Sequence, residues 1–339
     1  MKIQLHHNFE EIIGLENLLK AWKEFVRGKR NKKDVQSFQM RLMDNIFSLH
    51  DNLLHYTYKH GGYQAFKIND PKPREIHKAT VRDRLLHHAI YRKLYPFFAK
   101  TFIADSYSCQ LGKGTHKAIE KFRKFVHKVS KNNMRTCWVL KCDIKKFFAN
   151  IDHGILLEIL REYIPDKNIN RLLENIIGSF ETKAKVGLPL GNLTSQLFVN
   201  IYMNRFDQFV KHKLKMKYCI RYADDFVFLS DDKSKLEKLI SEIDEFLKNK
   251  LKLELHPDKV FIKTLASGVD FLGMVNFPDH RILRTATKRR MFKKLKNKFR
   301  KLKESMISEE SFNQSLQSCL GMLKHCRGYK IKKEIERNI

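Results

Sequence analysis

The sequence predicts an α+β fold organised around an antiparallel sheet, and three observations support this. Two adjacent aspartates, Asp224 and Asp225, lie between short runs of strand-forming residues at 217–220 and 226–229, a pattern typical of a hairpin. A further apolar strand, which begins at residue 139, ends in Asp143. Residues 233–251 carry apolar side chains at helical spacing, so this segment is expected to pack as an amphipathic helix against the strands.

Residues 1 to about 65 predict a helical opening. Apolar residues recur at helical spacing up to Trp22, a basic connector covers 28–33, and the helical pattern resumes over 35–54. Glycines at 61 and 62 then interrupt the chain. Residues 63–76 predict a β-hairpin that turns at the Asn-Asp-Pro-Lys-Pro sequence of 69–73.

Two further segments lead into helices. Arg82 and Asp83 open a helix after the hairpin, and Asp83 suits either an internal ion pair or a contact with a template. A glycine-rich loop at 112–114 precedes a predicted helix over 115–129. The loop lacks the Gly-x-x-x-x-Gly-Lys-[Ser/Thr] spacing of nucleotide-binding P-loops, so the sequence does not predict ATP binding.

Asp143, Asp224 and Asp225 are the predicted catalytic residues. Transfer of a nucleotide to a 3′ hydroxyl uses two divalent ions about 4 Å apart, which activate the hydroxyl and neutralise the leaving group. Carboxylates from separate strands can hold such ions, and Mg²⁺ prefers hard oxygen ligands. We therefore expect two Mg²⁺ ions, for which Mn²⁺ can substitute, held by these aspartates with Ile144 beside them. The alternatives are a solvated turn for the Asp-Asp pair and a strand-end cap for Asp143.

These motifs resemble, in their order, those of the reverse transcriptases. Asp143 corresponds to the first carboxylate motif of their palm, and Tyr222-Ala223-Asp224-Asp225 corresponds to their Tyr-X-Asp-Asp box. The resemblance implies a right-hand polymerase with an antiparallel-sheet palm, α/β fingers and a small helical thumb. It also implies template-directed addition of deoxynucleotides to a 3′ hydroxyl.

The same resemblance divides the chain into three regions. Residues 1–136 are expected to form an N-terminal helical extension and fingers, residues 137–284 a palm with part of the fingers inserted, and residues 285–339 a basic helical thumb. The last region holds 16 Lys and Arg against 5 Asp and Glu, so it carries +11 of the net charge of +30. A helix with one basic face in this region is expected to line a nucleic-acid duplex.

Phe148 lies five residues after Asp143, where RNA-dependent RNA polymerases of RNA viruses usually carry a second aspartate that accepts the ribose 2′ hydroxyl. A bulky ring at this position should collide with that hydroxyl, so Phe148 predicts deoxyribonucleotide substrates. The alternative is that Phe147 and Phe148 are core aromatics, which we expect to hold for one of the two.

Residues 186–202 predict a glycine-flanked loop followed by a helix. Glycines on both sides of Pro189 allow close approach to a nucleotide, and Thr194 or Ser195 is expected to cap a helix whose apolar side chains face the core. Most reverse transcriptases have Gln and Pro where this chain has Leu190 and Gln196. The Leu-Gly-Asn-Leu-Thr-Ser-Gln sequence of 190–196 instead resembles that of diversity-generating retroelement reverse transcriptases, which copy a template-repeat RNA with errors concentrated at adenines.

An amide side chain at this position would restrain the nucleotide by hydrogen bonding, whereas Leu190 supplies only shape. Mispairing is therefore expected to be less costly. The alternative is that Leu190 is an ordinary loop anchor and that fidelity is normal. The resemblance implies six nucleotide-binding residues: Lys72, Arg74, Phe148, Leu190, Gly191 and Lys259. It implies that fidelity depends on Leu190, Ser195 and Gln196. It also implies that the primer or template contacts Tyr222, Phe271, Leu272 and Gly273.

The balance of 67 Lys and Arg against 37 Asp and Glu indicates a polyanionic partner. The resemblance implies a template RNA, an RNA/cDNA duplex, deoxynucleoside triphosphates and a small basic accessory protein, the accessory variability determinant. Six cysteines lack the spacing of a structural zinc site. The chain has no apolar run of membrane-spanning length, so we expect no membrane association and a cytoplasmic protein encoded by a bacterium or phage.

Three alternatives stay open. The first is an accurate bacterial reverse transcriptase of the retron or phage-defence type. The second is a group II intron maturase, which the short thumb, Leu190 and Gln196 disfavour. The third, from another class, is a catalytically silent RNA-binding protein derived from a polymerase, which the intact aspartates disfavour.

Overall fold

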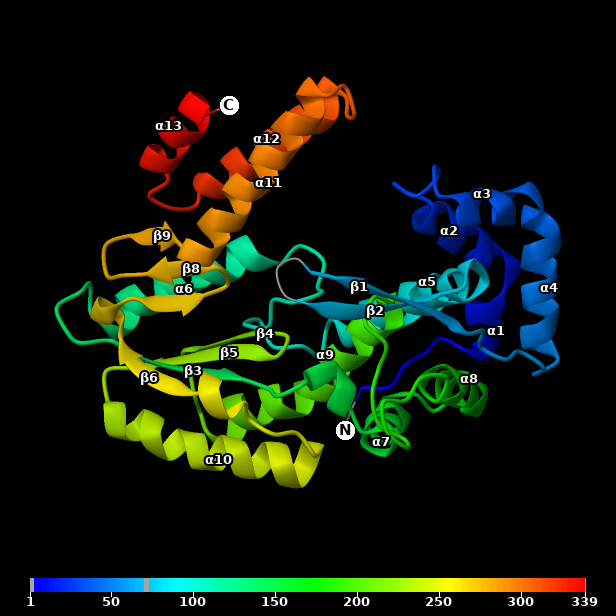
Figure 1. Ribbon diagram of the computed structural model, residues 1–339. Helices are drawn as coiled ribbons and strands as arrows, with labels where there is room; N and C mark the ends of the chain where they lie inside the picture. The colour runs from blue at the N-terminus through cyan, green and yellow to red at the C-terminus, as the bar shows by residue number, and fades with distance from the viewer. Residues whose placement is uncertain (1–2, 70–72, 339) are drawn as a thin grey trace.

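The computed structural model describes residues 3–69 and 73–338 and confirms the α+β fold with antiparallel sheets. Figure 1 shows a sheet with helices around it in the lower left, a helical region with a long hairpin at the right, and a group of helices rising above the sheet at the C-terminal end. Within the described residues, no helix is both long and apolar enough to cross a membrane.

The central sheet has the strand order β4-β5-β3-β6, and all its pairs are antiparallel. The strands are β3 (Trp138–Asp143), β4 (Cys219–Tyr222), β5 (Asp225–Ser230) and β6 (Phe261–Thr264). The hairpin around Asp224 is thus confirmed. Side chains alternate between two cores: Leu140 and Cys142 belong to one hydrophobic cluster and Val139 to another.

Helices cover both faces of this sheet. The face of Leu140 packs with α9 (Leu193–Gln208) and α10 (Lys233–Leu251). The face of Val139 packs with α6 (Thr115–Val129) and β7 (Val269–Phe271). The helices predicted over 115–129 and 233–251 are confirmed to the residue.

The region at the right of Figure 1 comprises the N-terminal helices and the long hairpin. Its elements are α1 (Phe9–Ile13), α2 (Leu15–Phe25), α3 (Lys33–Met40), α4 (Leu42–Leu54), β1 (Tyr63–Ile68), β2 (Arg74–Ala79) and α5 (Val81–Phe98). Two helices that follow β3 in the chain, α7 (His153–Tyr163) and α8 (Lys167–Ile177), lie below this hairpin. The predicted hairpin at 63–76 is confirmed, with β2 continuing to Ala79.

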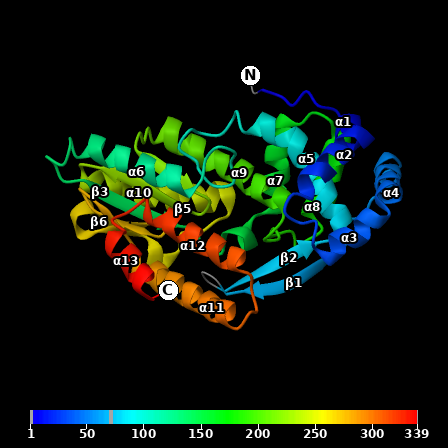
Figure 2. The same cartoon turned by 90° about the horizontal axis from the view of Figure 1, so that it is seen from above.

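The C-terminal region has a core of its own. A three-stranded sheet of β7, β8 (Met274–Asn276) and β9 (Arg281–Leu283) leads into α11 (Thr285–Lys303), α12 (Glu309–Leu323) and α13 (Tyr329–Asn338). A separate cluster of buried apolar side chains joins β9 to these three helices. Figure 2 shows α11 and α12 from above, where they pass over the rest of the molecule, and Asn69 after β1 lines one cavity together with residues of α11.

One prediction about a helix start was wrong. Helix α9 begins at Leu193 with Asn192 at its N-cap, so Thr194 and Ser195 are not caps but buried residues of the first turn. The Asn192 side chain makes no capping hydrogen bond, and its amide Nδ2 donates to the His77 carbonyl of β2. Asparagine is itself a favoured N-cap residue, and the cap lies two residues before Thr194.

Candidate active site

The three aspartates meet at one end of the central sheet. Tyr222 pairs with Asp225 at the end of the β4–β5 ladder, so Ala223 and Asp224 form the turn, and Ala223 takes a φ of 56°. Asp225 is also the register partner of Asp143 on β3. The main-chain N–H of Ile144 donates to the Asp224 carbonyl at 3.1 Å. Strand register therefore brings together residues that lie more than eighty positions apart in sequence.

Burial and mutual repulsion perturb two of these carboxyl groups. Burial raises the pKa of Asp225 to about 6, and the charges of Asp143 and Asp224 add to this, while Lys141 opposes it. Burial also raises the pKa of Asp224, followed by the charge of Asp143, while Arg74 and Lys259 act in the other direction. The end of the sheet thus concentrates negative charge in a poorly hydrated place, as cation sites do.

Two lysines balance this charge. The Nζ atom of Lys259 lies 2.7 Å from Oδ1 of Asp143, and Nζ of Lys141 lies 3.2 Å from Oδ2 of Asp225. Lys141 also donates to the Asp270 carbonyl at 3.0 Å. Lys141 was not predicted as a site residue. Its signal was a lysine inside an apolar strand, two residues before an aspartate.

Arg221 is a second residue that the sequence analysis missed, although it opens the Arg-Tyr-Ala-Asp-Asp sequence. Its side chain is 1% exposed and forms a bidentate ion pair with Asp207, at 2.7 and 2.6 Å. The same guanidinium donates to the hydroxyl of Ser106 at 3.0 Å and to the carbonyl of Ala223 at 3.1 Å. Arg221 therefore fixes the turn that carries Asp224 to the helix behind it.

The loop before α9 is tied to the β1–β2 hairpin. The N–H of His77 donates to the Leu190 carbonyl at 2.9 Å, and the Asn192 side chain donates to the His77 carbonyl at 3.0 Å. Gly191 has a φ of +107°, and a Cβ there would lie 2.8 Å from Cγ2 of Ile76. The half-buried Leu190 is thus held beside β2, while Ser195 is buried and Gln196 half-buried within α9.

The predicted nucleotide-binding residues fall in three places. Lys72 lies outside the described residues, and Arg74 is exposed at the first position of β2, close enough for its charge to act on Asp224. Phe148 is half-buried and packs edge-on against Phe147 at 5.6 Å between ring centres. Phe147, which is 3% exposed, is the core aromatic of this pair.

Three of the predicted primer-contacting residues, Tyr222, Phe271 and Leu272, pack on the same face of the central sheet, that of Val139. Leu272 and Gly273 form the turn between β7 and β8, with φ values of 51° and 86°. Phe271 is buried and packs on Phe122 of α6. The Tyr222 hydroxyl accepts a hydrogen bond from Thr115 at 3.2 Å.

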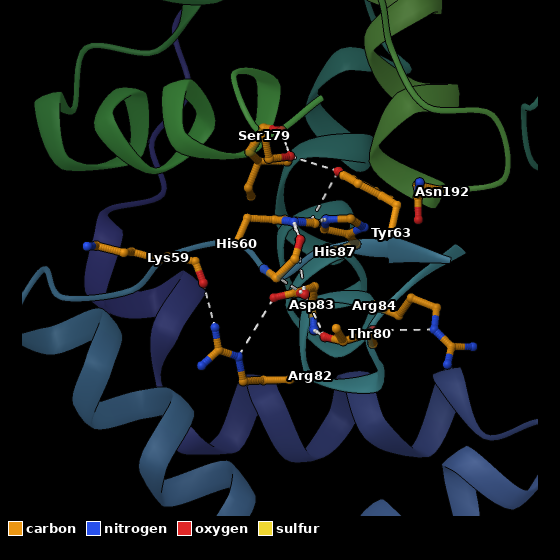
Figure 3. Close-up of polar contacts among 12 residues, drawn as sticks. Lys59, His60, Tyr63, Thr80, Arg82, Asp83, Arg84, His87, Ser179 and Asn192 are labelled. Atoms are coloured by element: carbon orange, nitrogen blue, oxygen red, sulfur yellow. Dashed lines mark hydrogen bonds and ion pairs between the residues drawn. The ribbon is translucent and has the colours of Figure 1, made fainter. Parts of the chain in front are cut away.

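Asp83 makes contacts inside the protein and is not exposed. Its fully buried carboxylate accepts hydrogen bonds from Tyr58 at 2.8 Å, Thr80 at 2.5 Å and the N–H of Gly61 at 3.1 Å. Figure 3 shows this carboxylate pointing into a cluster with His60 and His87 rather than toward solvent. It fixes the chain before β1 to the start of α5.

Fold and site together define a class: a right-hand polymerase whose palm presents carboxylates at one end of an antiparallel sheet. Residues 66–276 match the family described as reverse transcriptase (RNA-dependent DNA polymerase), and the chain belongs to this family. It is thus an RNA-directed DNA polymerase by class, that is, a nucleotidyltransferase.

Several known proteins are similar to this chain. Protein YkfC of Escherichia coli is 27% identical over 73% of this chain and 73% of its own length. The group II intron-encoded protein LtrA of Lactococcus lactis is 24% identical over 66% of this chain but only 47% of its own length. A solved structure of apo telomerase from Candida tropicalis has a TM-score of 0.49 and 14% identity, covering 71% of this chain and 60% of that one.

Reverse transcriptases generally use divalent metals, typically Mg²⁺. The donor chemistry here fits such ions, because the carboxylates are hard oxygen ligands and Oδ1 of Asp225 is buried without a hydrogen-bond partner in the described structure. Over residues 3–69 and 73–338, however, no three acidic, histidine or cysteine side chains are gathered as around an ion. Lys141 contacts Oδ2 of Asp225 and Lys259 contacts Oδ1 of Asp143, so these two oxygens are already engaged while Oδ1 of Asp225 is not.

Proposed function

We propose that this protein copies a template RNA into cDNA and makes its errors mainly at template adenines, so that the cDNA diversifies a target gene. Leu190 carries the finer part of this proposal. It supplies only shape in a loop where most reverse transcriptases have glutamine, and its carbonyl is tied to β2. Gly191, Ser195 and Gln196 complete the sequence typical of diversity-generating retroelements.

In the proposed mechanism Asp143, Asp224, Asp225 and the main chain at Ile144 hold two Mg²⁺ ions. When bound, these ions lower the pKa of the attacking 3′ hydroxyl and neutralise charge on the triphosphate. Arg74 offers a guanidinium fork to the phosphates. Lys259, freed from Asp143, offers an ammonium group that can donate a proton to the leaving pyrophosphate.

The path proposed for the RNA/cDNA duplex lies between the hairpin and α11. A cavity of about 510 Å³ is lined there by Asn69 at the end of β1 and by a polar and basic row on α11 that includes Lys293, Lys294 and Lys301. Lysines spaced along one helix face follow a phosphate backbone without reading its sequence. On the other side of this path, the primer end is proposed to be positioned by Tyr222, Phe271, Leu272 and Gly273.

Leu190→Gln tests the adenine-specific part of the proposal. A regained hydrogen bond to the nucleotide contributes about 1 kcal/mol, so errors at template adenines are expected to fall about fivefold. The measurement is sequencing of cDNA copied from a defined mixed-sequence RNA with Mg²⁺ and the four deoxynucleotides.

Leu193→Gln, the same change at a half-buried leucine in the first turn of α9, is the matched control and should leave the adenine errors unchanged. Accurate copying by the unaltered protein would retain the reverse transcriptase and reject the diversifying function. An equal effect of both substitutions would show that Leu190 has no specific part in fidelity.

Phe148→Ala is expected to relax the choice of sugar. The clash of a ring with a 2′ hydroxyl costs about 1–3 kcal/mol, so the preference for deoxy- over ribonucleotides should fall about 5- to 150-fold. The ratio of kcat/KM values for the two substrates measures this. Phe246→Ala, at a half-buried ring on α10, should leave the ratio intact; an unchanged ratio for Phe148→Ala would remove the proposed role.

The second candidate function is accurate reverse transcription of the group II intron type, and the observation behind it is the similarity to the group II intron-encoded protein LtrA. A polymerase-derived RNA-binding protein without catalysis is a third, and it predicts no Mg²⁺-dependent extension. The diversifying function further implies a small basic accessory protein and a site of action in the cytoplasm of a bacterial or phage-infected cell. If addition of such a protein restores cDNA synthesis on a template RNA, the proposed accessory protein is supported.

A further inference from the structure

A second basic cavity lies at the junction of the palm and the C-terminal helices. It has a volume of about 320 Å³ and is lined by α6, by the connection between β8 and β9, and by the connection between α12 and α13. In Figure 1 these three segments come together at the upper left, on the side of the molecule away from the β1–β2 hairpin. No residue lines both this cavity and the one beside α11.

The cavity carries positive charge that the protein does not neutralise. Arg123 on α6 and Lys324 and Arg327 in the α12–α13 connection are exposed. Across the described part of the chain, none of these three forms an ion pair or a side-chain hydrogen bond. The acidic lining residues are already engaged, Glu120 with Arg281 and Asp279 with the side-chain amide of Asn133.

Arg281 supplies a guanidinium at the wall of the cavity. Its side chain is 11% exposed, and one terminal nitrogen contacts Oε1 of Glu120 at 2.5 Å. The other, Nη1, is buried and has no hydrogen-bond partner in the described structure. A buried donor of a charged group without a partner is costly, so a bound acceptor oxygen would satisfy it. The main chain of Arg281 accepts the N–H of Arg327 at 2.9 Å, which ties the two arginine-bearing segments together.

Flat rings lie next to these cations. His325 stacks on His116 with 3.8 Å between ring centres, and His280 stacks on Phe277 at 4.8 Å. His325, His280 and Phe277 line the cavity. These three rings are half-buried, and aromatic rings beside arginines are the combination with which proteins hold unpaired bases.

We propose that this cavity binds single-stranded RNA, with Arg123, Arg281, Lys324 and Arg327 on the phosphates and the rings at 277, 280 and 325 stacking on a base. This site goes beyond the copying of RNA, because it lies outside the proposed path of the primer and template. It retains a segment of the RNA on the enzyme while another segment is copied. An acidic protein segment would use the cations alone, whereas a base can also stack on the accessible part of the rings, so RNA is the occupant that the lining favours.

The test uses the full chain saturated with a primer–template duplex, to which a short labelled single-stranded RNA is added. Arg123→Ala, Lys324→Ala and Arg327→Ala are combined, since all three side chains are exposed and their loss should leave the fold intact. Each lost phosphate contact lowers the salt slope of single-strand binding by about 0.7. Fluorescence anisotropy across a salt series is therefore expected to show a slope smaller by about 2 and a Kd raised about tenfold.

The matched control removes three exposed lysines of α10 that have no ion pair within residues 3–69 and 73–338, by Lys235→Ala, Lys238→Ala and Lys250→Ala, and should change neither value. The cavity triple variant should extend the saturating primer at the normal rate, and 4-thiouridine in the bound RNA should cross-link to 276–281 or 324–327 in the unaltered protein. Equal weakening by both triples, or RNA binding only when primer–template is absent, would overturn the site. Displacement of the RNA by polyglutamate or inorganic phosphate at equal charge would reassign the cations to an acidic protein or to a free anion.

Discussion

Asp224→Asn is expected to abolish DNA synthesis while the fold persists. The amide keeps the shape of the side chain but loses the charge that the proposed metal ions require. Loss of one metal-binding carboxylate removes several kcal/mol of transition-state stabilisation, so the rate should fall at least about 10³-fold. Single-turnover extension of a primer on an RNA template measures this loss.

The stability of the Asp224→Asn variant should not fall with its activity. Burial and Asp143 raise the pKa of Asp224 in the folded protein. At pH values above this pKa, the ionised carboxylate opposes folding, and the neutral amide removes that opposition. The melting temperature of Asp224→Asn should therefore equal or exceed that of the unaltered protein. Asp231→Asn, at an exposed residue after β5, should leave synthesis unchanged; undiminished synthesis by Asp224→Asn would refute the proposed mechanism.

Arg221→Met should have the largest effect on stability. The change leaves the Asp207 carboxylate buried without its guanidinium partner, and breaking such a buried pair costs about 3–5 kcal/mol. Urea denaturation followed by circular dichroism measures the free energy of unfolding. An unchanged midpoint would mean that the ion pair contributes nothing to the fold.

A second substitution separates stability from positioning. Arg221→Met combined with Asp207→Leu removes both buried charges, and apolar replacement of a buried ion pair is often neutral. The double variant should therefore recover most of the free energy of unfolding. Its kcat should remain low at unchanged KM for template, because the Ala223 carbonyl still lacks the guanidinium that holds the turn. Recovery of kcat along with stability would show that Arg221 has only a structural role.

Local patterns were sufficient for much of the fold. The helices at 115–129 and 233–251 and the hairpin around Asp224 follow from side-chain periodicity, because one face of each element is buried and the other is not. The start of α9 did not follow, because Asn192, Thr194 and Ser195 are all residues favoured at an N-cap and propensity alone does not decide among them.

The candidate site, too, could be predicted from the sequence only in part. The three aspartates could be singled out because each stands at the end of an apolar strand, and antiparallel pairing then places them together. Lys141 and Arg221 could not be assigned, because their partners, Asp225 and Asp207, are fixed only by the three-dimensional arrangement. The roles proposed for Phe148, Leu190 and Lys259 rest on the family resemblance and stay predictions.

The separate hydrophobic core of the C-terminal helices has a mechanical consequence. Leu283, Met291 and Leu295 pack with one another and with α12 and α13, and none belongs to either core of the central sheet. The junction is instead held by polar links: Arg284 donates from its main chain to Gly273 at 3.1 Å and pairs with Asp270 at 2.7 Å. Because this block has a core of its own, we expect it to be able to shift as a unit relative to the central sheet without disturbing the packing of either part.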